Sequence, residues 1–451
     1  MNVYELREKY PLFIYHGWEA EENESSFKVT YHFEIEGLAS FYPTFTCPKP
    51  DGETYTDKKI IREAIFSLGM VELVSYWKIT CSPKVEVRCG SLNTDQVKWW
   101  KKLYYHGLGE FFYINDIHMN MDEFMDLEGC WSVIDGADYV PSYHGNLIPV
   151  GGGKDSFVSM AVLESLRNDN HAFVINNVMS AVHAVEAAGY NDQFIQVFRT
   201  LDKTMLELNK QGYLNGHTPF SALAAFAAYL VSLVWKKEYI CLSNESSANE
   251  STIQGETINH QYSKSFEFEQ DFKYYVDTYL DPGIHYFSLL RPLSELQITS
   301  IFATLKDFHP VFKSCNVGSK QEVWCGHCAK CLFVYIMLSA FLDDEDLIKI
   351  FGHDLMDDPD MRTLLEELTG MAENKPFECV GTRDEVNTAL CMAISRRDKL
   401  SHLFEVYRNS EFYDVYSKKE NAYSHYFNEE NLVPEHFEEL VKEKLQECWK
   451  Y

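Results

Sequence analysis

Basic side chains are scarce in this chain. Lysine and arginine together number 40, against 68 aspartates and glutamates, so the formal net charge at pH 7 is −28. A surface of this charge repels phosphate backbones, which argues against tRNA or DNA as a substrate. We therefore expect a small-molecule ligand and no nucleic acid.

The sequence also lacks a long hydrophobic run, an internal repeat and a low-complexity tract. Its N-terminus shows no basic segment followed by an apolar stretch, so we expect no export signal. The most apolar segment, residues 219–235, is rich in alanine and aromatic residues and is short for a membrane span, which favours a buried helix. Apolar residues at 46% and aromatic residues at 15% exclude a mainly disordered chain. We expect a globular protein with no membrane partner.

Twelve cysteines are present, and four of them lie close together in the sequence: Cys315, Cys325, Cys328 and Cys331. This distribution indicates a metal site in a reducing compartment rather than a disulfide framework, which predicts a cytoplasmic location. Thiolates are preferred ligands of closed tetrahedral zinc sites, and short spacings on a tight turn let consecutive sulfurs converge on one ion. We predict a structural Zn²⁺ held by these four cysteines. Two alternatives stay open: His327 in place of Cys315, and a metal-free cluster of buried thiols.

A glycine-rich loop follows a short apolar run (146–150) and precedes an amphipathic segment (157–166). It consists of Gly151, Gly152, Gly153, Lys154, Asp155 and Ser156. This order predicts a strand, a tight loop and a helix. Glycines let a ligand approach the backbone closely, and bare N–H groups at a helix start favour an anion, most often a phosphate. Because Asp155 would repel that anion, we expect Mg²⁺ between them, so the loop predicts a magnesium-bound polyphosphate.

Two common nucleotide-binding loops do not fit this stretch. A Walker A loop ends in Gly-Lys-Ser/Thr, whereas Asp155 follows Lys154 here, and Ile148 stands where the first glycine belongs. The dinucleotide fingerprint needs a glycine at the position of Ser156. The loop instead resembles the PP-loop of the N-type ATP pyrophosphatases, S-G-G-x-D-S after a strand, with Gly151 replacing the first serine. The resemblance implies a site that binds ATP and releases pyrophosphate; the alternative is a glycine-rich turn that opens a purely structural helix.

The length of 451 residues exceeds what one core usually holds, so we expect two or three domains. Residues 27–46 alternate apolar and polar positions, which predicts strands with one buried face. Further patterns predict strands at 84–88, 146–150, 171–175, 193–198 and 239–242, and helices at 59–74, 95–105, 181–188, 202–210 and 332–342. Alternating strands and helices after the loop predict an α/β fold with a parallel sheet covered by helices on both faces. We divide the chain into an N-terminal α+β module (1–140), a PP-loop ATP-binding domain with the cysteine turn (141–345) and a mainly helical C-terminal part (346–451).

Ligands of parallel sheets lie beyond the carboxyl ends of the strands. The glycine loop leaves its strand at that edge, and so does the segment 243–250, which follows the strand predicted at 239–242. We predict that Asn244 and Glu245 are substrate or magnesium ligands. The alternative is that both are ordinary turn-forming residues.

Five short motifs, taken in order, resemble those of the MurL-type enzymes. They are Ser75-Tyr76-Trp77-Lys78, His106-Gly107-Leu108-Gly109-Glu110-Phe111, the glycine loop, Ser243-Asn244-Glu245-Ser246-Ser247-Ala248 and Pro376-Phe377-Glu378-Cys379-Val380-Gly381. The similarity spans residues from about 27 to 400. It implies an ATP-dependent epimerase that converts the terminal L-Glu of UDP-N-acetylmuramoyl-L-Ala-L-Glu to D-Glu through an acyl-adenylate, releasing AMP and pyrophosphate. Its partner would be this small UDP-linked peptide, a precursor of peptidoglycan.

The resemblance also implies roles for the loop residues. The three glycines and Ser156 would hold the β- and γ-phosphates of ATP, Lys154 would neutralise charge near them, and Asp155 would hold Mg²⁺. Adenylation has a chemical reason, because an ionised carboxylate resists loss of the neighbouring α-proton. A mixed anhydride with AMP removes that charge and lets the developing charge spread as an enolate.

The base that removes the α-proton is harder to assign. Cys379 is the first candidate, because a thiolate can accept a carbon-bound proton when a nearby cation or helix start lowers its pKa. Glu110, Glu245 and His217 are alternatives, and Cys379 can equally be a buried, inert thiol.

Two other functions are compatible with parts of this sequence pattern. An amide- or nitrile-forming synthase, such as a 7-cyano-7-deazaguanine synthase, would share the loop and the cysteine turn but would need ammonia. A nucleotide sensor would bind ATP at the loop without turning it over.

Overall fold

The computed structural model describes residues 2–130, 133–249, 262–315, 317–318, 321–376, 378 and 380–449, so Cys379 lies outside the described residues. The chain forms two compact units that alternate along the sequence. The first comprises Met1–Leu147, Ile195–Ile240 and Ile258–Tyr286, and the second Ile148–Phe194, Cys241–Thr257 and Phe287–Tyr451. The division at residues 140 and 345 remains a prediction.

The first unit contains a sheet in which several strands alternate buried and more exposed side chains. Its strands are β1 (Leu12–Glu22), β2 (Ser26–Ile35), β3 (Ala39–Phe41), β4 (Thr44–Pro48), β5 (Lys84–Val87) and β6 (Asp126–Gly129). β2 pairs antiparallel with β1, β3 and β4, whereas β5 pairs parallel with β1 and β6. β2 buries every second residue from Phe27 to Ile35. This period-two burial confirms the strand pattern predicted for residues 27–46.

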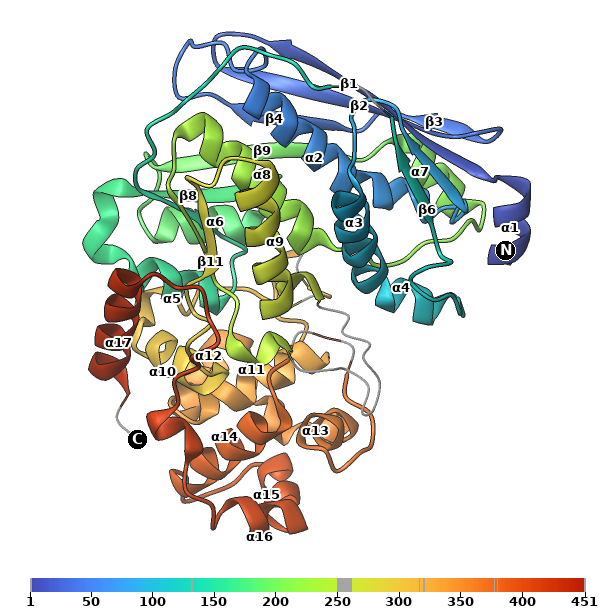
Figure 1. Ribbon diagram of the computed structural model, residues 1–451. Helices are drawn as coiled ribbons and strands as arrows, with labels where there is room; N and C mark the ends of the chain where they lie inside the picture. The colour runs from blue at the N-terminus through green and yellow to red at the C-terminus, as the bar shows by residue number, and fades with distance from the viewer. Residues whose placement is uncertain are drawn as a thin grey trace. The chain divides into compact units, whose positions relative to one another are not determined.

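Helices cover the buried side of this sheet. The helices of the first unit are α1 (Val3–Lys9), α2 (Lys59–Trp77), α3 (Thr94–Gly107), α4 (Gly109–Ile114), α7 (Lys203–Lys210), α8 (Phe220–Trp235) and α9 (Phe266–Tyr279). α2 packs on β1 and β2 and also on α8 (Figure 1). α8 is apolar on all sides and almost wholly buried, as predicted for residues 219–235.

The predicted α/β fold is confirmed, but its sheet is mixed and mostly parallel, not parallel throughout. β10 (Tyr239–Leu242) pairs parallel with β7 (Asn146–Pro149). β11 (His285–Ser288) lies on the other side of β10, where the N–H of His285 donates to the carbonyl of Glu238. β9 (Phe194–Thr200), however, pairs antiparallel with β4 at Thr44 and Thr200. A strand predicted for the ATP-binding domain therefore joins the sheet of the predicted N-terminal module.

The second unit is mainly helical. Its elements are β8 (Asn170–Ile175), α5 (Lys154–Val162), α6 (Met179–Ala187), α10 (Glu295–Thr304), α11 (Ala329–Ser339), α12 (Asp344–Phe351), α13 (Arg362–Thr369), α14 (Arg383–Ser395), α15 (His402–Arg408), α16 (Glu411–Tyr416) and α17 (Glu435–Cys448). The helical character predicted for residues 346–451 is confirmed. Gly352 and Gly370 end α12 and α13 in the left-handed conformation typical of helix C-termini. Val150, directly after β7, donates its N–H to Phe173 O of β8 at 2.9 Å, so the glycine loop begins beside β8.

Within the described part of the chain, no helix combines the length and the apolar character needed to cross a bilayer.

Candidate active site and metal centre

The glycine loop is held through its middle residue. Gly152 has φ +84°, and a Cβ atom there would lie 2.5 Å from the carbonyl carbon of Ser180 at the start of α6. Its carbonyl accepts the N–H of Lys313 at 3.0 Å. At Gly151, by contrast, a Cβ atom would meet nothing within 4 Å, so there is room for the serine of the PP-loop pattern. Glycine is therefore required by the backbone at position 152 and not at 151.

Lys154, the first residue of α5, lies in a buried ion-pair cluster. Its side chain is only 3% exposed, and its ammonium pairs with the carboxylate of Asp155 and with Glu295 Oε1, the latter at 2.7 Å. Burial opposes the charged form, but the two carboxylates outweigh it and raise the pKa of Lys154. The ammonium therefore stays charged and is shared between two acids.

Glu295 was not predicted from the sequence. It opens α10 behind the cap residue Ser294, whose hydroxyl accepts the N–H of Gln297. Burial raises the pKa of the Glu295 carboxyl, and Lys154 opposes that shift. Its backbone N–H donates to Glu385 Oε1 at 2.7 Å, and Glu385 in turn belongs to the capping box that opens α14. The first turns of α5, α10 and α14 are thus tied together around one ammonium and three carboxylates.

The loop after β10 lies against the same cluster. Ser243 exchanges a hydrogen bond of 2.8 Å with Ser159 of α5. The Asn244 amide donates to Ser288 Oγ at 3.1 Å, and the charge of Glu245 contributes to the raised pKa of Glu295. The structure therefore brings the two predicted segments, the glycine loop and residues 243–245, together within the second unit.

A buried arginine supports this second loop. Arg291 is fully buried, and its guanidinium donates to the backbone carbonyl of Glu245 at 2.8 Å. A guanidinium can serve several acceptors in one plane, so Arg291 fixes the loop backbone. No motif in the sequence had indicated Arg291.

Two of the alternative bases lie in the first unit. His217 Nδ1 is 4.0 Å from Glu110 Oε2. Beside them, the buried Lys78 ammonium donates to Gly216 O at 2.6 Å, which fixes the backbone next to His217. Glu110 and His217 are thus neighbours, while Cys379 lies outside the described residues.

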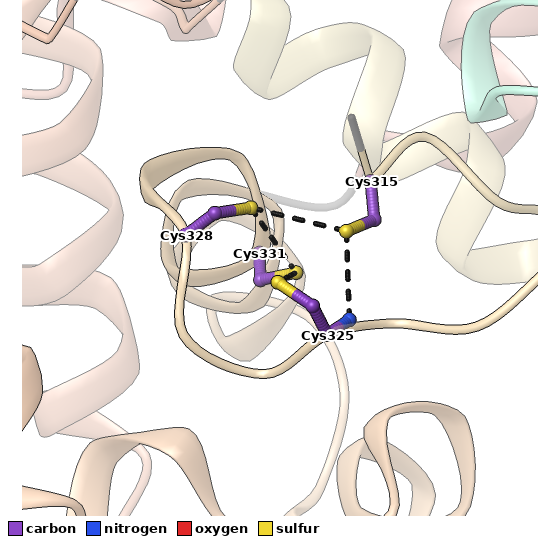
Figure 2. Close-up of side chains that lie close together, drawn as sticks. All are labelled: Cys315, Cys325, Cys328 and Cys331. Carbon is purple, nitrogen blue, oxygen red and sulfur yellow. Dashed lines mark hydrogen bonds between the residues drawn. The ribbon is translucent and has the colours of Figure 1, made fainter. Parts of the chain in front are cut away.

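The four predicted cysteines form one cluster in the second unit, shown with their side chains in Figure 2. Cys328 Sγ is 3.9 Å from Cys315 Sγ and 3.5 Å from Cys331 Sγ, and Cys325 Sγ is 3.7 Å from Cys331 Sγ. None of the four forms a disulfide. Cys325 lies before α11, Cys328 is its N-cap, and Cys331 lies in its first turn.

These sulfurs fit a tetrahedral metal. Four sulfurs at about 2.3 Å from one Zn²⁺ lie about 3.8 Å from one another, close to the separations seen here. The N–H groups of Gly318 and Cys325 both point to Cys315 Sγ, at 3.1 and 3.4 Å, and would stabilise it as a thiolate. His327 Nδ1 instead contacts the carbonyl of Cys325 at 2.7 Å. The four-cysteine set is therefore able to bind a structural metal such as zinc.

A second group of possible ligands lies on β1 and β2 of the first unit: His16, His32 and Glu34. The imidazoles of His16 and His32 stack with their centroids 4.3 Å apart and their planes at 18°. A metal lies in the plane of each imidazole that binds it, so rings this close to parallel do not converge on one ion. The stack is a ring contact, and beside it His16 Nε2 forms a hydrogen bond with Glu34 Oε2 at 2.7 Å.

We predict that replacing one buried cysteine of the cluster removes the metal. The purified protein should carry about one zinc per chain, and Cys331→Ser should carry almost none and melt at a lower temperature, because a closed site needs all four ligands. Elemental analysis and thermal melting measure both effects. Cys391→Ser, a free cysteine outside the cluster, is the control and should keep its metal. Wild-type protein without metal, whose melting temperature a chelator leaves unchanged, would contradict the site.

Two known family domains and three curated relatives match this sequence. The MurL N-terminal domain matches residues 5–289, and the MurL C-terminal domain matches residues 311–421. Three curated relatives are named UDP-N-acetyl-alpha-D-muramoyl-L-alanyl-L-glutamate epimerase. That of Xanthomonas oryzae pv. oryzae is 32% identical over 346 residues, covering 75% of this chain and 76% of the relative. Those of Micromonospora sp. and Salinispora tropica are each 32% identical. Each match covers 79% of this chain, and the matches cover 80% and 79% of the lengths of these two relatives, respectively. No solved structure matches.

Proposed function

This chain belongs to the MurL family, and from that premise we propose that it is an ATP-dependent epimerase of UDP-N-acetylmuramoyl-L-Ala-L-Glu. In this proposal the terminal L-Glu becomes D-Glu through an acyl-adenylate, with AMP and pyrophosphate as products. The observation that carries it is the glycine loop at the start of α5, with Lys154 buried between Asp155 and Glu295. A backbone anion site with charged groups at its base supports the binding of a polyphosphate.

The loop would act on ATP through positioning and electrostatics. Its backbone N–H groups and the helix dipole of α5 would bind the β- and γ-phosphates of the leaving group. The N–H of Gly151 donates to Ser156 Oγ at 3.1 Å, so the Ser156 hydroxyl already lies in the loop. Holding the leaving pyrophosphate in this way favours attack of the substrate carboxylate on the α-phosphorus.

The charges of the cluster support a requirement for magnesium. The Lys154 ammonium already pairs with two carboxyl groups, those of Asp155 and Glu295, so its single positive charge is not free to neutralise a ligand. A polyphosphate would add further negative charge, so a divalent cation is needed to offset the repulsion. We propose Asp155 as a magnesium ligand, with Asn244 and Glu245 on the neighbouring loop as further magnesium or substrate ligands. Glu295 would then hold the Lys154 ammonium in position.

Epimerisation also needs a group that moves the α-proton. Cys379 remains our first proposal for that base, with Glu110, Glu245 and His217 as alternatives. The zinc-type cluster would stabilise the fold rather than catalyse, because four cysteine ligands leave no open coordination position.

The test is incubation with ATP, Mg²⁺ and the L-Ala-L-Glu nucleotide in D₂O. We expect pyrophosphate release, D-Glu on chiral analysis and deuterium at the α-carbon.

Asp155→Asn should lower pyrophosphate release at least about 100-fold, because it removes the charge that would hold magnesium. Cys379→Ala should keep pyrophosphate release and lose deuterium exchange if Cys379 is the base. ATP turnover that depends on ammonia, without epimerisation, would contradict the proposal and favour the synthase alternative.

A further inference from the structure

A cavity of about 420 Å³ lies in the second unit, between the end of α6 and the segment that precedes the cysteine cluster. Residues of α6 line one side, namely His183, Glu186 and Ala187, and the other side is lined by Val311 and Lys313 together with Glu322, which lies between Cys315 and Cys325. Its volume falls within the range of small-molecule sites.

Both walls of the cavity are connected to the glycine loop. Lys313, on one wall, donates its backbone N–H to Gly152 O at 3.0 Å. The other wall is formed by α6, which begins at Met179, and Gly152 packs so closely against Ser180 of its first turn that no Cβ fits. The cavity therefore lies next to the proposed phosphate site, because Gly152 contacts both of its walls.

The polar groups of the cavity favour a neutral hydrogen-bond donor over a phosphate. Glu322 Oε1 pairs with His183 Nδ1 at 2.8 Å, and the Lys313 ammonium donates to the carbonyls of Pro310 and Phe312. Glu186 is an exposed residue of the cavity lining, and its carboxylate makes no ion pair or hydrogen bond to the described residues, so it remains an acceptor for a ligand. Two carboxylates against one ammonium repel phosphate and attract hydroxyl and amino groups.

We propose that this cavity binds the ribonucleoside part of a nucleotide, with the Glu186 carboxylate accepting the ribose hydroxyls. An acidic side chain on the ribose hydroxyls is a recurrent way in which proteins recognise dinucleotides. The aliphatic faces of Ala187 and Val311 provide apolar surface for the sugar and base. The inference rests on the proposed use of the glycine loop for phosphates. ATP and the UDP-linked peptide each carry a ribonucleoside, and the experiment distinguishes them.

The experiment compares three probes by calorimetry with Mg²⁺ present: ATP, UDP and inorganic tripolyphosphate, which has the phosphates without the nucleoside. Ala187→Trp fills the cavity, and Glu186→Ala removes the acceptor. Each should weaken the binding of one nucleotide about 10-fold, Glu186→Ala through the loss of a hydrogen bond to a charged group and Ala187→Trp through steric exclusion, and leave the affinity for tripolyphosphate within about twofold. Glu345→Gln, an exposed glutamate on α12, is the matched control, and thermal melting checks that the variants are folded.

The outcomes separate this inference from the function on which it rests. A selective loss of ATP affinity assigns the cavity to adenosine, and a selective loss of UDP affinity assigns it to uridine. Unchanged affinity for both nucleotides in both variants overturns the inference, as does an equal loss of tripolyphosphate affinity, which would show an effect on the loop alone. Wild-type protein that binds neither ATP nor tripolyphosphate overturns the proposed function instead.

Discussion

Replacing Gly152 with alanine should abolish ATP-dependent pyrophosphate release. The new methyl group would lie 2.5 Å from the carbonyl carbon of Ser180 and 2.8 Å from the backbone nitrogen of Ala181. These are backbone atoms and cannot rotate away, and φ +84° is itself strained for alanine. The loop must therefore leave α6, and its N–H groups lose their common direction. Because misplacement by about 1 Å costs about 100-fold in rate, we expect at least that loss in a pyrophosphate assay.

The chain provides two matched controls for this variant. A Cβ atom at Gly151 meets nothing within 4 Å, and one at Gly153 makes only an ordinary contact of 3.5 Å with Ser314. Gly151→Ala and Gly153→Ala should therefore bind Mg·ATP much better than Gly152→Ala. Equal losses in all three variants would show that general flexibility, and not the close approach to α6, matters in this loop. Full activity of Gly152→Ala would exclude the loop as the phosphate site.

Replacing Lys154 with methionine should destabilise the region around α5 by about 3–5 kcal/mol, the cost of leaving a buried ion pair with one partner. The change removes the ammonium that Asp155 and Glu295 share, at side-chain exposures of 3% for Lys154 and 4% for Glu295. The double variant Lys154→Met with Glu295→Gln should recover part of that loss, because it removes the unpaired carboxylate. Native-state hydrogen exchange of the α5 and α10 amides measures the free energy of local opening.

A surface pair provides the control for this cycle. Lys349 is 71% exposed and pairs with Asp346 at 3.0 Å, so solvent screens the pair and Lys349→Met should leave the free energy of local opening almost unchanged. If Lys154→Met costs no more than Lys349→Met, the buried cluster does not stabilise the loop. If the double variant is as unstable as Lys154→Met, Glu295 is not the group left unpaired.

Features encoded by neighbouring residues were predicted well. The spacing Cys325, Cys328, Cys331 places three sulfurs on one turn, and the structure adds Cys315 as predicted. The apolar run at 219–235 is the buried helix α8, and the glycine loop does open a helix. That helix begins at Lys154, three residues earlier than predicted, because Gly153 serves as its N-cap.

Pairings between distant segments were predicted less well. The alternation of residues 193–198 indicates a strand but not its partner, so the antiparallel pairing of β9 with β4 changed a parallel sheet into a mixed one. The same applies to Glu295. The pattern Ser294-x-x-Gln297 could have been recognised as a helix start, yet nothing local indicates that Glu295 meets Lys154.

The sequence by itself determined most of the helices and strands, the group of four cysteines and the family of the chain, because spacing and backbone preference act over a few residues. Only the tertiary structure decided which carboxylates pair with the Lys154 ammonium and where a cavity adjoins the loop. It also decided that, of the three loop glycines, only Gly152 cannot carry a side chain. These depend on contacts between segments far apart in the chain, whose geometry is fixed by packing and carries no local signal.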